Sequence, residues 1–194
     1  MLGWSGVAWA GAGWELGGRV GMEQIYLGGD GSPSDLRGFV FALQPAARVS
    51  RHFALGLSLE ASLYPRRSDR VDSGPLASSA AAFLEAGAQT HPGEPCSASL
   101  ALSAGYRRLW LPLDAGGTDA FWAIEAFRLQ GGPSFRAGDR VRIEILLGGG
   151  FGWFFAARGA RECAITAACP DSLYGSTTQS SVHFTLDLSV AVRG

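Results

Sequence analysis

Along most of this chain, apolar side chains alternate with polar or small ones at every second position. The pattern is clearest in residues 52–64, 140–155 and 181–192. In the first of these segments one face carries Phe and Leu, whereas the other carries Ala, Gly, Ser and Glu. Side chains of a β-strand alternate between two faces, whereas an α-helix would spread the same apolar residues around its whole circumference. These segments are therefore predicted as β-strands.

Weaker copies of the pattern bring the predicted number of strands to eight, with a bulge near Ala126–Phe127 where the alternation shifts by one residue. The connections alternate in length. Short ones lie around 49–51, 91–95 and 137–139, longer ones around 28–35, 65–78 and 158–180, and an intermediate one around 113–118. This layout is typical of an up-and-down membrane barrel with short periplasmic turns, longer outer loops and periplasmic termini.

We therefore predict an all-β fold, a closed eight-stranded antiparallel up-and-down transmembrane β-barrel. Residues 13–194 form the barrel domain, and residues 1–12 form an N-terminal periplasmic segment. Closure is required because an open sheet edge would leave unpaired N–H and C=O groups in hydrocarbon. An even number of strands allows that closure to be antiparallel.

The composition excludes several other classes of protein. Hydrophobic residues make up 47% of the chain and charged residues 17%, which argues against disorder. The longest uncharged apolar stretch, residues 145–157, is interrupted by glycines and is shorter than the ~18 residues that a spanning helix needs. A formal net charge of −1 argues against nucleic acid as a partner, because phosphate binding requires a basic surface.

The predicted polar faces carry acidic and basic residues in near balance. An eight-stranded barrel is narrow inside, so it accommodates small side chains and a few paired charges better than ranks of Leu and Phe. We therefore predict an interior charge network and an apolar face turned toward lipid. The residues of this network are Glu15, Arg19, Glu23, Arg48, Glu60, Glu85, Arg107, Arg128, Arg142, Glu144 and Asp187. The alternative is a soluble, lipocalin-like carrier with the charges in solvent and an apolar ligand inside.

Aromatic residues gather near the predicted strand ends. Tyr26, Tyr64, Trp110, Trp122, Trp153 and Phe155 lie toward the long-loop end, and Trp14, Phe53 and Phe135 toward the short-turn end. Two such girdles are typical of a barrel anchored at both lipid–water interfaces.

With these features the chain resembles the small eight-stranded outer-membrane barrels of Gram-negative bacteria, of the OmpA and OmpX type. The resemblance is architectural and covers roughly residues 13–193. It implies a bacterial outer-membrane protein with periplasmic termini and with membrane lipid as a partner. The loops 65–78 and 158–180 are the expected contact surface for another protein, because functional variation in such folds resides in loops on a rigid scaffold.

No motif for nucleotide binding or metal-dependent catalysis is present, and we expect no catalytic residue, cofactor or metal site. The run Gly148 to Gly152 lies inside a strand pattern, so it is predicted to make space for large neighbours. His183, Thr185 and Asp187 share one strand face, but positions i and i+4 lie some 13 Å apart at ~3.4 Å per residue, too far for a relay.

Three cysteines are present, and the pair with five residues between them, Cys163 and Cys169, is predicted to form a loop disulfide. The expected function is a membrane anchor, surface binding protein or assembly component without an open pore. Two alternatives stay open at this point: an outer-membrane lipid-modifying hydrolase, and the lipocalin-like carrier.

Overall fold

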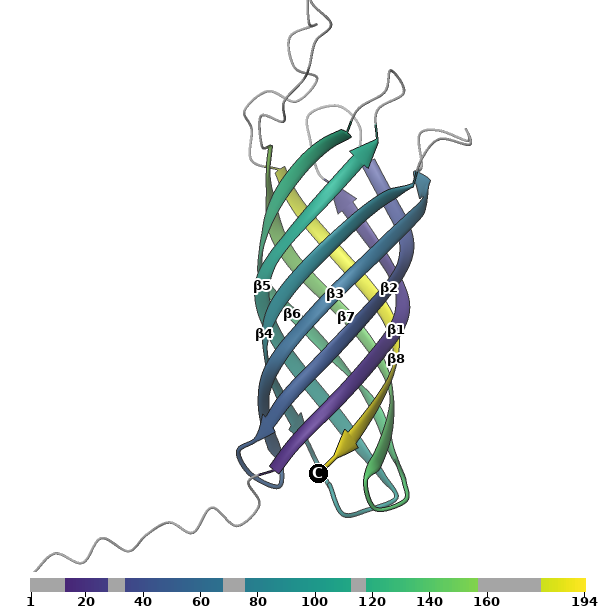
Figure 1. Cartoon of the computed structure of the whole chain (residues 1–194), viewed down its shortest axis with the longest axis vertical. Helices are drawn as coiled ribbons and strands as arrows, with labels where there is room; N and C mark the ends of the chain where they lie inside the picture. The colour runs from purple at the N-terminus through teal and green to yellow at the C-terminus, as the bar shows by residue number, and fades with distance from the viewer. Residues whose placement is uncertain (1–12, 28–33, 68–75, 113–117, 157–178) are drawn as a thin grey trace, which may run out of the picture.

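Eight antiparallel strands form one closed barrel in which each strand pairs with its neighbours in sequence (Figure 1). The structure, a computed structural model, describes residues 13–27, 34–67, 76–112, 118–156 and 179–194. The strands are β1 (Gly13–Leu27), β2 (Ser34–Arg48), β3 (Phe53–Arg67), β4 (Ala77–Gln89), β5 (Cys96–Pro112), β6 (Thr118–Ala137), β7 (Val141–Ala156) and β8 (Gln179–Arg193). The predicted fold class is confirmed.

Closure joins the first strand to the last. β1 and β8 pair from Glu15 opposite Arg193 to Leu27 opposite Ser181, so no strand of the sheet has a free edge. The C-terminus lies at the end of the barrel that carries the β2–β3, β4–β5 and β6–β7 turns (Figure 1). The last of these turns contains Gly138, whose φ of +84° lies in the left-handed region that glycine adopts without strain. We call this end the turn end and the opposite end the loop end.

A bulge in β6 confirms the predicted shift of alternation. The register changes between Glu125 and Phe127 on the side of β7, and between Ser103 and Gly105 on the side of β5. As a result Ala126 and Phe127 both point outward. The extra residue keeps both Glu125 and Arg128 inside the barrel.

The outer wall of the barrel is apolar on every strand. Large side chains such as Phe41, Leu57 and Leu186 are about half exposed, at 50%, 45% and 48%. Monomeric soluble proteins rarely expose contiguous apolar patches larger than a few hundred Å². This wall surrounds the whole barrel, so it suits a bilayer and is opposite to the orientation that a lipocalin-like carrier requires. Among the described residues, no helix is long and apolar enough to cross a membrane.

The lumen has three layers along its axis. Apolar residues fill it at the loop end, a charged network occupies the centre, and a small cavity with further charges lies at the turn end. The apolar layer consists of Ile25, Leu36, Tyr64, Ala77, Leu109, Phe121, Ala123 and Phe154. The prediction that Tyr64 belongs to the outer aromatic girdle was wrong. Tyr64 is 2% exposed and points inward, where its hydroxyl donates to the carboxylate of Glu23.

Candidate functional site

Arg107 of β5 lies at the centre of the buried charge network and is fully buried. Its Nε donates to Oε1 of Glu125 at 2.5 Å, and its two terminal nitrogens donate to the two oxygens of Glu23 at 3.0 and 2.7 Å. One terminal nitrogen also donates to the hydroxyls of Tyr64 and Ser79, each at 2.9 Å. The planar guanidinium thus joins strands on opposite sides of the barrel through its fork of donors.

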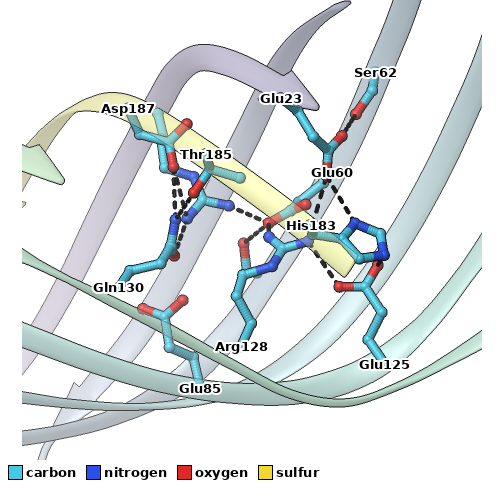
Figure 2. Close-up of polar contacts among 12 residues, drawn as sticks. Glu23, Glu60, Ser62, Glu85, Glu125, Arg128, Gln130, His183, Thr185 and Asp187 are labelled. Atoms are coloured by element: carbon cyan, nitrogen blue, oxygen red, sulfur yellow. Dashed lines mark hydrogen bonds and ion pairs between the residues drawn. The ribbon is translucent and has the colours of Figure 1, made fainter. Parts of the chain in front are cut away.

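Arg128 of β6 extends this network with a second guanidinium group that bonds two carboxylates. It donates to Glu60 at 2.7 Å and to Glu125 at 2.9 Å. Glu60 also accepts a hydrogen bond from Arg19, so one carboxylate of β3 holds arginines from two other strands. Figure 2 shows these carboxylates and Arg128 converging inside the barrel. Because each carboxylate faces a cation, the desolvation cost of the buried charges is offset by Coulomb attraction and hydrogen bonds.

A polar branch continues from Arg19 toward β8. Arg19 donates to the side-chain oxygen of Gln130, and the Gln130 amide nitrogen donates to Asp187 at 2.6 Å and to Thr185 at 3.1 Å (Figure 2). Asp187 lies 3.7 Å from a terminal nitrogen of Arg19. We call the set Arg19, Glu23, Glu60, Arg107, Glu125, Arg128, Gln130 and Asp187 the central network.

Alternate glycines of β7 provide the space that this network occupies. A Cβ atom at Gly148 would lie 2.5 Å from Cγ of Gln130 and 2.7 Å from the Thr185 hydroxyl. A Cβ at Gly150 would lie 3.2 Å from Cβ of Arg128, and one at Gly152 would lie 3.0 Å from Cα of Glu125. The glycine run therefore lines the network, which agrees with its predicted structural role.

Phe83 of β4 is an apolar member of the same layer. Its ring lies 4.3 Å from the guanidinium carbon of Arg128 and 6.0 Å from that of Arg107. A cation over an aromatic face is attracted by the ring quadrupole, more strongly where water is excluded. The ring therefore replaces part of the hydration that the two arginines lose.

A second charged group lies nearer the turn end. Glu15 accepts hydrogen bonds from Arg142, from Arg193 at 3.1 Å and from Arg48 at 3.4 Å. Two of these arginines also donate to the Gln89 side-chain oxygen. We call Glu15, Arg48, Gln89, Arg142, Glu144 and Arg193 the turn-end cluster.

A cavity of about 70 Å³ lies at the turn end of the lumen, and five of the six residues of the turn-end cluster line it. Glu85, Gln44 and Gln130 are among its lining residues, together with the small residues Gly17 and Gly56. Glu85 accepts hydrogen bonds from Gln44 at 3.2 and 3.4 Å and lies apart from the central network (Figure 2). At ~10–15 Å³ per water molecule, the cavity holds a few waters rather than an organic ligand.

All eleven residues named from the sequence as an interior network point into the barrel, but they form two groups rather than one. Arg19, Glu23, Glu60, Arg107, Arg128 and Asp187 belong to the central network, and Glu15, Arg48, Arg142 and Glu144 to the turn-end cluster. Glu85 lies between the groups.

Sequence reasoning missed several interior residues. Glu125 accepts hydrogen bonds from two arginines. The bulge in β6 shifts the alternation beside it, so the sequence pattern did not show that Glu125 points inward. Gln130 and Tyr64 lie on inward positions that alternation alone could have assigned. Arg193 and Phe83 also point inward, yet a terminal arginine and a phenylalanine carry no signal that marks them as members of a network.

His183, Thr185 and Asp187, which share one face of β8, do not form a catalytic relay. His183 does not bond Thr185 or Asp187; Gln130 instead donates to the Thr185 hydroxyl and to Oδ2 of Asp187. Nε2 of His183 lies 3.2 Å from Oγ of Ser181, and its Nδ1 lies 3.6 Å from Glu23. This Ser–His–Glu order has distances near those of a nucleophile with its base. Ser181 is only 1% exposed, however, and does not line the lumen cavity.

The three cysteines lie in two different parts of the chain. Cys163 and Cys169 lie outside the described residues, so their disulfide stays a prediction, whereas Cys96 is exposed and free. Within the described ranges, no group of three or more His, Cys, Asp and Glu residues could hold a metal ion.

No protein-family model matches the chain, and its sequence matches no curated protein. Solved structures match it over nearly their whole length. Neisserial surface protein A gives a TM-score of 0.54 at 11% identity, covering 91% of this chain and 96% of that one. Ail of Yersinia pestis gives a TM-score of 0.47 at 14% identity, covering 93% of this chain and 99% of that one. The N-terminal β-barrel domain of Pseudomonas aeruginosa OprF gives a TM-score of 0.46 at 9% identity, covering 91% of this chain and 97% of that one. At such low identity, the similarity to the first of these concerns the fold alone.

Proposed function

Since the chain has the architecture of the small eight-stranded outer-membrane β-barrels, we propose that it is an integral outer-membrane protein with periplasmic termini and no open pore. It acts as a membrane anchor that presents its long connections for surface binding or assembly. The apolar wall supports insertion, since closed barrels satisfy every backbone group in lipid. The position of the C-terminus at the turn end supports the orientation, because short turns of such barrels are periplasmic.

The observation that carries this proposal is the bridging of the lumen by Arg107. From β5 it reaches Glu23 on β1 and Glu125 on β6, and all three side chains are fully or almost fully buried. Apolar side chains fill the layer above it. Ions or solutes would have to break these pairs to pass, which argues for an anchor rather than a porin.

Conductance across planar lipid bilayers tests the absence of a pore. We expect the purified, refolded protein to give no porin-like conductance steps, because the central network occludes the lumen. The triple variant Arg107→Ala/Arg128→Ala/Glu23→Ala is the matched comparison and is expected to show small steps if it remains folded. Regular steps from the unmodified protein would contradict the proposal of a closed barrel.

Topology is tested separately in intact cells. An accessible epitope inserted in loop 158–180 should be recognised by antibody from outside, whereas an epitope after Gly194 should be recognised only after the outer membrane is permeabilised. The reverse pattern would overturn the orientation. Release of the protein by carbonate washing would overturn its assignment as an integral protein.

We propose that contacts with another protein use the loops 65–78 and 158–180. Photo-cross-linkers placed in each loop should capture a specific species in native membranes, while a cross-linker at Gly93, an exposed position in the β4–β5 turn with free space around its Cβ site, should not. Equal capture from both ends of the barrel would argue against a dedicated loop surface.

We propose no enzymatic role. Although Ser181, His183 and Glu23 are aligned, all three are at most 2% exposed. Glu23 is also occupied by Arg107, Ser62 and Tyr64. A hydrolytic nucleophile must reach the carbonyl of its substrate, and Ser181 is enclosed by the barrel instead.

A further inference from the structure

Arg108 is an unusual residue for the outer wall. Among the strand side chains that the structure describes, the outward positions carry the arginines Arg37 and Arg108 and no acidic residue. A charged side chain on the lipid face of a barrel costs roughly 2–4 kcal/mol at the bilayer midplane and falls to about 0–1 near the interface. An outward arginine is therefore stable only near a headgroup region or beside an anion.

Its level in the wall places it at the edge of the apolar band. The outward residues of β5 from Ala98 to Tyr106 are Ala, Leu and Tyr, and the segment has nine residues. A transmembrane strand needs about 9–11 residues to cross the hydrocarbon core. Arg108 follows this segment directly on the loop-end side, so its guanidinium lies at the depth of lipid headgroups.

Two tryptophans hold this guanidinium. Its carbon lies 4.7 Å from the ring centre of Trp122, which is the direct cross-strand neighbour on β6, and 5.3 Å from that of Trp110. Trp122 is itself packed against Tyr106, with ring centres 5.1 Å apart. An aromatic ring attracts the cation without accepting an in-plane hydrogen bond from it, so the two tryptophans leave the terminal N–H donors of Arg108 for another group.

The guanidinium lacks a carboxylate partner in the described part of the chain. No ion pair joins Arg108 to a described acidic side chain. Its Nε atom is buried, so an outside group can meet only its two terminal nitrogens. This lack of an ion pair contrasts with the arginines of the lumen, each of which faces one or more carboxylates. An oriented arginine at headgroup depth, with in-plane donors and no internal anion, is suited to a phosphate, which it can bind through two parallel hydrogen bonds.

We propose that Arg108, held against Trp110 and Trp122, binds a phosphate group of a lipid headgroup in the outer leaflet. The inference rests on the proposed orientation of an integral outer-membrane barrel, because that orientation places the loop end in the outer leaflet. The tryptophan rings contact the upper acyl chains and the guanidinium contacts the phosphate. The site would thus bind a phosphorylated lipid at a defined position on the β5–β6 wall.

Binding of bisphosphorylated lipid A to the folded protein in detergent tests the inference. Native mass spectrometry over a lipid titration counts the bound lipid for the unmodified protein and for Arg108→Gln, Arg108→Lys and Arg136→Gln. We expect Arg108→Gln to weaken binding by about tenfold, as for loss of a charged hydrogen bond, and Arg108→Lys to weaken it less. Arg136→Gln, which removes an equal charge near the turn end, should bind like the unmodified protein.

Two further ligands identify the group that is recognised. Dephosphorylated lipid A should bind the unmodified protein as weakly as bisphosphorylated lipid A binds Arg108→Gln, and inorganic phosphate at equal concentration should not displace the lipid. Equal binding of the dephosphorylated lipid, displacement by inorganic phosphate, or unchanged binding by Arg108→Gln would each overturn the inference. Gel mobility before and after boiling establishes that each variant is folded, so loss of the lipid site is distinguishable from failure of the barrel to insert.

Discussion

Arg107 donates to both carboxylate oxygens of Glu23, at 3.0 and 2.7 Å, although the two residues are 84 positions apart and lie on β5 and β1. In a ring of eight strands these two are opposite each other. The pair therefore ties together the two halves of the barrel across the lumen. Unlike a hydrogen bond between neighbouring strands, it depends on the curvature that brings β1 and β5 to face each other.

Removing either partner of this pair should be strongly destabilising. Glu23→Ala leaves Arg107 with one fewer counter-charge in a buried site, and breaking a buried pair costs about 3–5 kcal/mol. Urea unfolding from detergent micelles or lipid vesicles, followed by tryptophan fluorescence, measures the loss. The double variant Glu23→Leu/Arg107→Met should lose less than Glu23→Ala, because no charge of this pair is stranded.

The control for that experiment is Arg136→Ala. Arg136 pairs with Asp139 at 2.8 Å, but the two side chains are 39% and 95% exposed. Such a surface pair contributes about 0–1 kcal/mol. If Glu23→Ala were no more costly than Arg136→Ala, the central network could not be a main source of barrel stability.

Gly148→Ala should destabilise the barrel through overpacking. The added Cβ would lie 2.5 Å from Gln130 and 2.7 Å from Thr185, so the branch of the network toward Asp187 must shift. Overpacking of a well-packed interior costs typically about 1–3 kcal/mol. Gly87→Ala is the matched control on an inward position, since nothing lies within 4 Å of its Cβ site. Equal unfolding free energies for the two variants would show that the space beside Gly148 is not filled as described.

Leu186→Arg should test the lipid-facing wall. Leu186 lies near the middle of β8 and is 48% exposed on the outer face. An arginine at the bilayer midplane of such a barrel costs roughly 2–4 kcal/mol, compared with about 0–1 near an interface. Leu76→Arg, outside the strands at the loop end, is the comparison. In lipid vesicles only the first variant should unfold at clearly lower urea concentration; similar values would contradict the proposed membrane position.

Ser181→Ala tests whether the buried serine has a catalytic role. We expect the variant and the unmodified protein to leave the mass spectrum of lipid A identical when each is expressed, because Ser181 is 1% exposed. A change of lipid A mass with the unmodified protein that disappears in Ser181→Ala would establish a hydrolase instead.

The period-two pattern alone was sufficient to predict eight strands, their alternating faces and the β6 bulge. Leu57 and Leu186 point outward and Glu60 and Asp187 inward as the alternation indicates, because a strand allows only two side-chain directions. The pattern did not separate residues that share a face but differ in depth. Tyr64 was assigned to the girdle from its position near a strand end, although alternation places it on the inward face, in the inner apolar layer.

What the sequence determined by itself was local: which residues form strands, which face of each strand is apolar, and where the alternation shifts. Which charges bond was decided only by the closed barrel, because strand register and stagger bring Arg107 to Glu23 and Arg128 to Glu60 over separations of 84 and 68 positions. Local patterns carry no information about such distances across a lumen. The outward contact of Arg108 with Trp122 likewise depends on the pairing of β5 with β6, which the alternation within either strand does not encode.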